Sequence, residues 1–406
     1  AAGSEHGGQA GAGVIIDTGA SNIPVLISDD FVVVDGLNLT TTTTNCAWVQ
    51  GAGTVMRNCI ASASDRGFMI YGGSVTAPNV LENCVGSGGS SHAFYVLGGG
   101  PQSADAHAKI VNCTGSSNGN DAFRTQATAG GTSATAEYIN CVGLSSLTHQ
   151  SVGSFTAVTG SGNVGGTTNR WPVGTRALSQ FWTFTSDDTA LPTGNQAIYN
   201  ATTGALVNVP GNDAVGVGTA TGAPATDILG KARVREGSYG ALYADPGAFT
   251  TDRVDLGGTV GVGKDYTTYT SAEADTGSYT SLAKSNVRYV FTATPGETIS
   301  SLSIFIVETT SETGPEHNVR FQCLDKTNRA RRVGLAPTNT DALRVIEGFV
   351  EWDGIDLEGP GGFRVVGMAS ASGVNTVGFR LSNCVLTNAA LGVQIGMTNR
   401  SVPGFN

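Results

Sequence analysis

The chain has few charged residues: Asp, Glu, Lys and Arg make up 13% of its 406 residues, and the formal net charge is −10. An intrinsically disordered chain carries more charge and fewer Val, Ile and Phe residues, so we expect a folded protein. The shortage of Lys and Arg also argues against a nucleic-acid-binding surface, which requires a basic patch. The composition therefore predicts no nucleic-acid partner.

Long apolar runs and helical patterns are missing as well. No run approaches the roughly 20 apolar residues of a membrane-spanning helix, so we expect no membrane insertion. No window keeps the i, i+3, i+4, i+7 apolar spacing of an amphipathic helix. The 58 glycines do not follow the three-residue period of collagen. Together with frequent Gly, Ser, Thr, Asn and Val, these absences predict an all-β chain of short strands joined by tight turns.

Motifs of common metal and cofactor sites are also absent. The 7 cysteines include no Cys-x-x-Cys pair and no Cys/His cluster with zinc spacing. The sequence contains no Gly-x-Ser-x-Gly, no phosphate-binding loop and no dinucleotide fingerprint. Because an odd number of cysteines cannot all pair, we interpret them as small buried hydrophobic residues. The sequence predicts neither a metal nor a cofactor.

What the chain does have is a repeat around the dipeptide Asn-Cys. Similar stretches carry the dipeptide at Asn58, Asn83, Asn112, Asn140 and, far along the chain, Asn383. Successive cysteines of the first four copies are 25, 29 and 28 residues apart, and a Phe follows each of the first three copies at a similar distance. A period of this length indicates a solenoid, a propeller or an array. A propeller blade needs about 40 residues and a regular Trp-Asp or Gly-His signature, which is missing here.

The residues around each asparagine predict a bend in the strand. Leu81 and Cys84 are both apolar but an odd number of positions apart, so a flat strand cannot bury both of them. A left-handed bend at Asn83 resolves the conflict, because asparagine is the non-glycine residue best suited to it. The repeat thus predicts a right-handed parallel β-helix with three short strands per turn of about 25–29 residues. Its asparagines, cysteines and phenylalanines are expected to form three stacked columns.

A second, longer repeat overlies the first. Phe31–Leu39 resembles Phe349–Leu357, and Asn58 with its neighbours resembles Asn383 with its neighbours, at offsets of 318 and 325 residues. A third match, Ser4–Gly8 with Pro315–Val319, has an offset of 311 residues and keeps the same order. We infer a tandem duplication, with chance similarity within one β-helix as the alternative. On this interpretation the chain is expected to be a window on a longer tandem protein, or a permuted duplication.

The repeats divide the chain into three parts. Residues 1–150 are assigned to the turns of a first parallel β-helix, and residues 257–406 to the start of a second, homologous one. Residues 151–256 lose the repeat and contain Trp171 and Trp182. Because the strand edges at the end of a β-helix must be covered, we expect this middle part to be a closing segment.

Two stretches near residue 250 carry a family resemblance. The pattern D-x-x-G-x-x-R … G-A is formed by Asp227, Gly230, Arg233, Gly240 and Ala241. Residues 261–269 read GVGKDYTTY. With the Asn-Cys repeat, these stretches resemble bacterial and bacteriophage right-handed β-helix proteins of the pectate-lyase-like superfamily. Ser238, Tyr239 and Leu242 depart from the usual form, which has Asp-Ile before Gly-Ala and an acidic residue after it.

The resemblance implies a fold and leaves the activity open. The superfamily includes polysaccharide lyases and hydrolases, phage tailspikes, fibre and capsid appendages, and surface adhesins, and a fold does not settle a function.

The strongest chemical candidates lie just before and after the repeated phenylalanines. The candidate catalytic residues, two positions before each Phe, are Arg66, His92 and Asp121. The candidate substrate-binding residues are Asp65, Tyr95 and Arg124. Stacked at about 4.8 Å per turn, they form a polar patch that suits a sugar-binding or sugar-cleaving groove. The alternative is a solvated turn, and it is favoured because the paired carboxylates of a glycosidase are missing.

These features favour a structural protein over an enzyme. We expect a rigid β-helical rod in a phage fibre, spike or capsid decoration, or in a tandem-repeat filament, at the extracellular or virion surface. Its expected partners are further copies of itself, other virion proteins, or a surface polysaccharide. The alternatives are a polysaccharide lyase or hydrolase that uses the row with Asp121, and a non-catalytic carbohydrate-binding adhesin.

Overall fold

The computed structural model divides the chain into two compact units, residues 1–235 with 243–252, and residues 236–242 with 253–406. Trp171 and Trp182 of the expected closing segment lie outside the described residues. The structure describes residues 14–19, 23–42, 44–99, 105–117, 120–128, 132–143, 147–152, 156–165, 176–177, 215–237, 241–279, 281–301, 305–307, 313–334, 343–345, 348–359, 364–369, 378–388 and 391–396.

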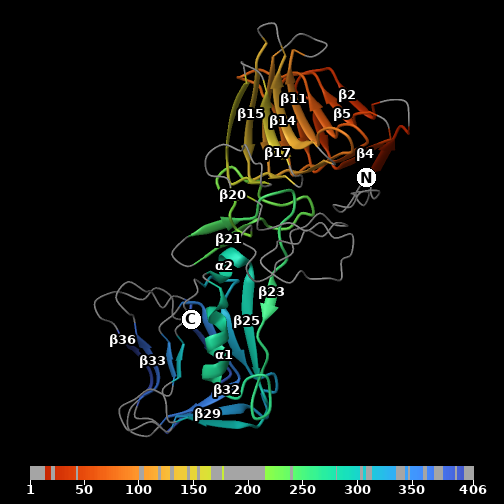
Figure 1. Ribbon diagram of the computed structural model, residues 1–406. Coiled ribbons are helices and arrows are strands. Elements are labelled where there is room, and N and C mark those ends of the chain that lie inside the picture. Colours follow the sequence, from red (N-terminus) through yellow and green to blue (C-terminus); the bar gives the residue numbers. More distant parts are fainter. Residues whose placement is uncertain are drawn as a thin grey trace. The chain divides into compact units, whose positions relative to one another are not determined.

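The first unit is built from three parallel β-sheets, which the chain enters in turn (Figure 1). Sheet A contains β1 (Val14–Asp17), β4 (Leu37–Thr41), β7 (Ile60–Ala63), β10 (Val85–Gly88), β13 (Thr114–Ser117), β16 (Val142–Gly143), β19 (Val164–Gly165) and β20 (Arg176–Ala177). Sheet B contains β2 (Val25–Ile27), β5 (Ala47–Val49), β8 (Phe68–Ile70), β11 (Phe94–Gly98), β14 (Asp121–Ala127) and β17 (Leu147–Val152). Sheet C contains β3 (Val33–Asp35), β6 (Val55–Arg57), β9 (Asn79–Glu82), β12 (Ala106–Val111), β15 (Ala134–Ile139) and β18 (Thr156–Ser161).

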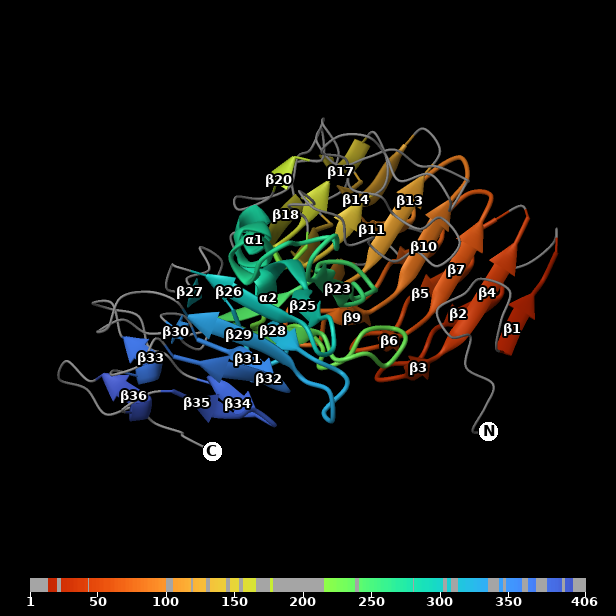
Figure 2. The ribbon, with the colours of Figure 1, turned by 90° about the horizontal axis from the view of Figure 1, so that it is seen from below.

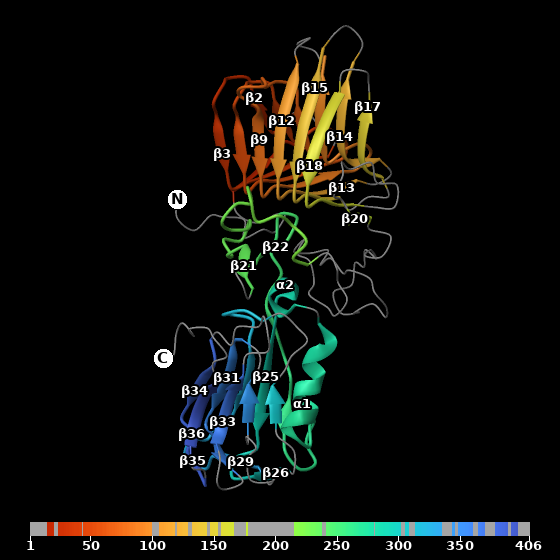
Figure 3. The ribbon, with the colours of Figure 1, turned by 90° about the vertical axis from the view of Figure 1, so that its left-hand side faces the viewer.

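Every pairing within these sheets is parallel. Figure 2 shows β1, β4, β7, β10 and β13 of sheet A side by side, and Figure 3 shows β9, β12, β15 and β18 of sheet C. We call three consecutive strands, one from each sheet, a rung. The predicted all-β class and parallel strands are confirmed.

The predicted bend occurs at each repeated asparagine, between a strand of sheet C and the next strand of sheet A. Asn58, Asn83, Asn112 and Asn140 all have φ between 50° and 53°, in the left-handed region. Their side-chain amides bond along the edge: Asn83 Nδ2 donates to Asn58 Oδ1 at 3.3 Å, and Asn140 Nδ2 donates to Asn112 Oδ1 at 3.3 Å. We call this row the asparagine edge.

The predicted phenylalanine column fills the interior of the first unit. Phe94 stacks on Phe68 with ring centroids 5.0 Å apart and on Phe123 at 4.8 Å, close to the ordinary spacing of neighbouring strands. Glycine in sheet A makes room for these rings, since a Cβ built on Gly86 or Gly115 lies 2.8 Å from the ring of Phe94 or 3.0 Å from that of Phe123, respectively. The close approach explains why glycine follows the Asn-Cys dipeptide in these two rungs.

The cysteines of the first unit are buried and unpaired, as predicted, whereas Cys384 of the second unit is only half-buried. Their thiols bond to backbone carbonyl groups: Cys113 Sγ donates to the carbonyl oxygen of Leu81 at 3.5 Å, and Cys141 Sγ to that of Ile110 at 3.3 Å. Burial raises the pKa of the Cys141 thiol to about 12. These thiols are therefore packing groups and poor nucleophiles.

The second unit also consists of parallel sheets, again entered in turn. Sheet D contains β23 (Val254–Leu256), β24 (Thr259–Val260), β25 (Val287–Ala293), β28 (Val319–Gln322), β31 (Val350–Asp353) and β34 (Arg380–Ser382). Sheet E contains β26 (Thr298–Ser301), β29 (Ala330–Gly334), β32 (Ile355–Glu358) and β35 (Leu386–Thr387). Sheet F contains β27 (Phe305–Val307), β30 (Leu343–Val345), β33 (Arg364–Ala369) and β36 (Leu391–Gly396).

A few short elements complete the described residues. They are α1 (Tyr269–Asp275), η3 (Thr276–Ser278), α2 (Leu282–Ser285) and the two-stranded sheet of β21 (Val234–Glu236) and β22 (Leu242–Ala244). Helix α1 begins with a capping box formed by Thr268 and Ser271. It lies alongside β25 in Figures 1 and 3. Its buried Tyr269 packs on the aromatic residues of sheet D, 6.1 Å from Phe321 and 5.2 Å from Trp352 between ring centroids.

Candidate functional site

The strand register brings the predicted catalytic row together. Phe68, Phe94 and Phe123 are paired across β8, β11 and β14, so the residues two positions earlier lie at or just before the starts of these neighbouring strands. His92 Nδ1 lies 3.9 Å from Asp121 Oδ2 and 3.3 Å from the Asp121 carbonyl oxygen. The bends between sheets A and B hold both side chains at this edge.

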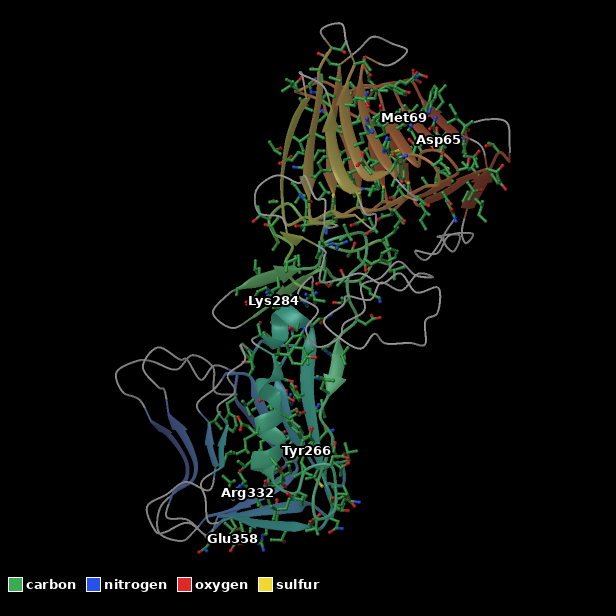
Figure 4. All side chains as sticks on the ribbon, in the orientation of Figure 1. Asp65, Met69, Tyr266, Lys284, Arg332 and Glu358 are labelled. Atoms are coloured by element: carbon green, nitrogen blue, oxygen red, sulfur yellow. The ribbon has the colours of Figure 1, made fainter. Side chains whose placement is uncertain are left out.

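The predicted binding residues surround the ring of Tyr95. The guanidinium carbon of Arg66 lies 5.3 Å from the ring centroid, and that of Arg124 lies 6.0 Å from it. Arg66 Nη1 also donates to Asp65 Oδ2 at 2.9 Å. Figure 4 marks Asp65 and Met69 in this part of the first unit. All six predicted site residues thus belong to one cluster, which we call the Tyr95 cluster.

Gln126 completes the cluster and was missed by the sequence analysis. Its Oε1 accepts hydrogen bonds from Tyr95 Oη at 2.8 Å and from Arg124 Nε at 2.9 Å. Arg124 Nη1 also lies 3.6 Å from Asp121 Oδ2. Gln126 stands two positions after Arg124 on β14, so the alternation of a strand places both on one face. That alternation was the available signal.

Burial limits what the Tyr95 cluster can do chemically. The side chains of His92 and Asp121 are only 6% and 3% exposed. Burial, strengthened by the charges of Arg124 and Arg66, lowers the pKa of His92 to about 4, so the imidazole is neutral at pH 7. Tyr95 is also buried and its pKa is raised, again by burial. The arrangement is a closed hydrogen-bonded cluster with its charged ends at the surface.

A small apolar cluster lies outside the main core, beside the Tyr95 cluster on sheet B. It contains Met69, Tyr71, Tyr95 and Leu97, with the half-buried Trp48 packed against it. The register pairs Trp48 with Met69 and Met69 with Tyr95, so these side chains form one row across three strands. The rings of Trp48 and Tyr71 meet edge to face at 5.5 Å.

The D-x-x-G-x-x-R motif has a structural role in the first unit. Asp227 Oδ1 accepts hydrogen bonds from the backbone N–H groups of Leu229 and Lys231. Gly230, with φ of 77°, completes the turn between these residues. Asp227 Oδ2 accepts the N–H of Thr250 at 2.9 Å. The motif therefore ties two stretches of chain together, residues 215–235 and 243–252, which we call the strap.

A buried ion pair holds the strap internally. Arg235 donates to both carboxylate oxygens of Asp245, at 2.8 and 2.7 Å, and Thr251 donates to the same carboxylate from its backbone and its hydroxyl. Burial by itself raises the pKa of Asp245, but Arg235 and Thr251 outweigh it and hold the pKa at about 2. Neither Arg235 nor Asp245 was singled out from the sequence.

The described residues offer neither a metal site nor a membrane-spanning helix. Among the residues that the structure describes, no group of three or more His, Cys, Asp or Glu side chains is placed to hold a metal ion. No helix in the described part of the chain is long and apolar enough to cross a membrane. The chain matches no model of a known protein family and no curated protein.

Proposed function

We propose that the chain forms a right-handed parallel β-helix that serves as a rigid structural rod, in an extracellular filament or a virion appendage such as a fibre, spike or capsid decoration. The observation that carries this proposal is the stacking of like side chains from rung to rung, above all Phe68, Phe94 and Phe123. Parallel strands joined by crossovers are right-handed in nearly all proteins. Regularity of this kind resists bending, because each rung is packed on the next over its whole width.

The Tyr95 cluster supports a structural role over a catalytic one. A general acid or nucleophile must touch its substrate, and the side chains of His92 and Asp121 are almost fully buried. The guanidinium groups of Arg66 and Arg124, from the same unit, both lie over the ring of Tyr95. The cluster therefore acts first as a brace between the three rungs that contain β8, β11 and β14.

The location of the protein tests the rod proposal. Antibodies raised against the chain should label filaments or virion appendages in electron micrographs of the intact source, and labelling confined to the cell interior would contradict the proposal. In parallel, polysaccharides incubated with the protein should show no new reducing ends and no absorbance of unsaturated sugars. Turnover that is abolished by Asp121→Ala would favour the lyase or hydrolase instead.

A second candidate function is binding of surface polysaccharide without cleavage. Two observations favour it: the side chains of Asp65 and Arg66 are 31% and 28% exposed, and the half-buried ring of Trp48 packs against the adjoining apolar cluster. Aromatic rings beside charged hydrogen-bonding groups suit a sugar. On a glycan array, Arg66→Ala should weaken any binding by about tenfold, whereas Lys109→Ala on sheet C should leave it unchanged.

A further inference from the structure

The asparagine edge carries hydrogen-bonding groups that point to a docking role beyond the bends themselves. Asn83 Nδ2 donates to the carbonyl oxygen of Thr226 at 2.9 Å, and Asn112 Nδ2 donates to that of Asp245 at 3.0 Å. A left-handed bend alone is satisfied by glycine, so it does not require these amides. The repeated side chain therefore has a second use at two successive rungs.

The contact at Asn140 resembles a pairing between two strands. Its Oδ1 accepts the backbone N–H of Thr219 at 2.7 Å, and its Nδ2 donates to the carbonyl oxygen of the same residue at 2.7 Å. A side-chain amide has the same donor and acceptor as a peptide group, so it can satisfy one residue of an approaching backbone completely. Asn140 thus binds the strap as an added strand residue would.

Arg233 locks the strap onto the same edge. It is fully buried, and its Nη2 donates to Asn83 Oδ1 at 2.7 Å while its Nη1 donates to the carbonyl oxygens of Asp245 and Gly247, both at 3.0 Å. Only the planar fork of a guanidinium reaches these acceptors from one position, because a lysine ammonium presents a single point. The Arg of the motif is therefore matched to the Asn of the repeat.

We propose that the asparagine edge is a binding surface for the Asp-x-x-Gly-x-x-Arg strap, and that the strap is a clasp which closes onto rungs that are already stacked. The bonds to Asn140, Asn112 and Asn83 join residues 79, 133 and 150 positions apart along the chain. Closing such long loops is slow compared with pairing neighbouring rungs, so the clasp forms last and opens first. This role holds whether the protein is a rod or an enzyme.

Amide hydrogen exchange of the full-length chain tests the clasp. In Asn140→Gly the left-handed bend is kept and only the side-chain amide is lost. We expect exchange of the Thr219 amide and its neighbours in the strap to rise by about tenfold or more, while amides inside β11 and β14 keep their protection. Asn383→Gly is the matched control: this asparagine has the same φ of 53° but donates to Asp353 in the second unit. It should leave the strap unchanged.

Arg233→Lys adds a second, independent variant. It retains the charge and loses the fork, so the strap should exchange faster while far-ultraviolet circular dichroism still reports folded sheets. Three results would overturn the proposal: a strap unchanged in both variants, an equal effect in Asn383→Gly, or simultaneous loss of protection in the strap and in β11 and β14 of Asn140→Gly. The last result would mean that strap and rungs form one cooperative unit.

Discussion

The two units use the same backbone corners and surround them with different contacts. Gly36 and Gly354 follow an aspartate at equivalent positions and have φ of 73° and 71°. One rung later, Asn58 Nδ2 donates to Asp35 Oδ1 at 2.9 Å, and Asn383 Nδ2 donates to Asp353 Oδ1 at 2.7 Å. The two matched stretches of sequence thus share their corner geometry.

What surrounds the corners differs between the units. In the first unit, hydrogen bonds between asparagine side chains join the asparagine edge from rung to rung, and the strap binds along it. In the second, Asp353 also accepts hydrogen bonds from Lys326 Nζ at 2.9 Å and Ser382 Oγ at 2.9 Å. On sheet D, Arg320 Nε lies 3.3 Å from Glu351 Oε2. Residue types at the bends fix the path of the chain, whereas the contacts outside the bends differ between the two units.

The largest expected effect comes from breaking each aromatic column. Phe94→Ala should lower the free energy of unfolding of the first unit by about 3–5 kcal/mol, because it leaves a cavity between two stacked rings. Phe321→Ala, equally buried between Phe291 and Trp352, is the matched change in the second unit. Urea titration followed by hydrogen exchange should show each variant weakening mainly its own unit. If either variant weakened both units equally, the expectation that each unit unfolds separately would be wrong.

The buried ion pair of the strap should give the next largest effect. Asp245→Asn leaves the Arg235 guanidinium buried without its counter-charge, which should cost the first unit about 3–5 kcal/mol at pH 7.

The same carboxylate predicts a pH dependence. Its pKa in the folded protein, about 2, lies below the ordinary value of 3.8, so its contribution is complete above pH 4 and is lost as the pH falls towards 2. The loss should approach about 2 kcal/mol in acid titrations of unfolding, and it should be absent in Asp245→Asn. A variant with the same acid dependence as the original chain would exclude Asp245 as its source.

The bends and the site differ in how far sequence could predict them. The asparagine bends followed from local patterning, because the parity of Leu81 and Cys84 forces a bend at Asn83, and the stacking of Phe94 followed from the period. The closure of the Tyr95 cluster did not follow, because burial of His92 depends on contacts between rungs. Arg233 was seen only as part of a motif, since its partner Asn83 is 150 residues away. Long-range partners of this kind leave no periodic signal.

The equivalent corners allow a more delicate test of the comparison. In Asn58→Ala and Asn383→Ala, an alanine must adopt the left-handed conformation without the side-chain hydrogen bonds of asparagine. Each change also removes the hydrogen bond to the aspartate of the preceding rung, Asp35 or Asp353. Each should lower the free energy of unfolding by about 1–2 kcal/mol. Asn→Gly at the same positions should cost less, because glycine keeps the backbone conformation. Clearly unequal alanine costs, measured by urea titration, would show that the two corners are not energetically equivalent.

The smallest expected effect concerns a second pair of unusual residues. Phe31 and Phe349 have φ of 59° and 50°, which is strained for a bulky side chain, and each ring covers a glycine in the next rung, Gly53 or Gly378. Phe31 is 73% exposed, whereas Phe349 is half-buried. In Phe31→Gly the relief of backbone strain should nearly offset the greater entropy of the unfolded chain, so stability changes by less than about 1 kcal/mol.

Phe349→Gly should be more costly by about 1 kcal/mol, because it gives the same backbone relief but also loses the packing of a half-buried ring. The difference in stability can be measured by heating the two variants and following hydrogen exchange in peptides of the unit that carries each change. If Phe31→Gly proved the more damaging change, the exposed ring would have to make a contact in the folded protein that burial alone does not reveal, and the two corners would differ in function as well as in packing.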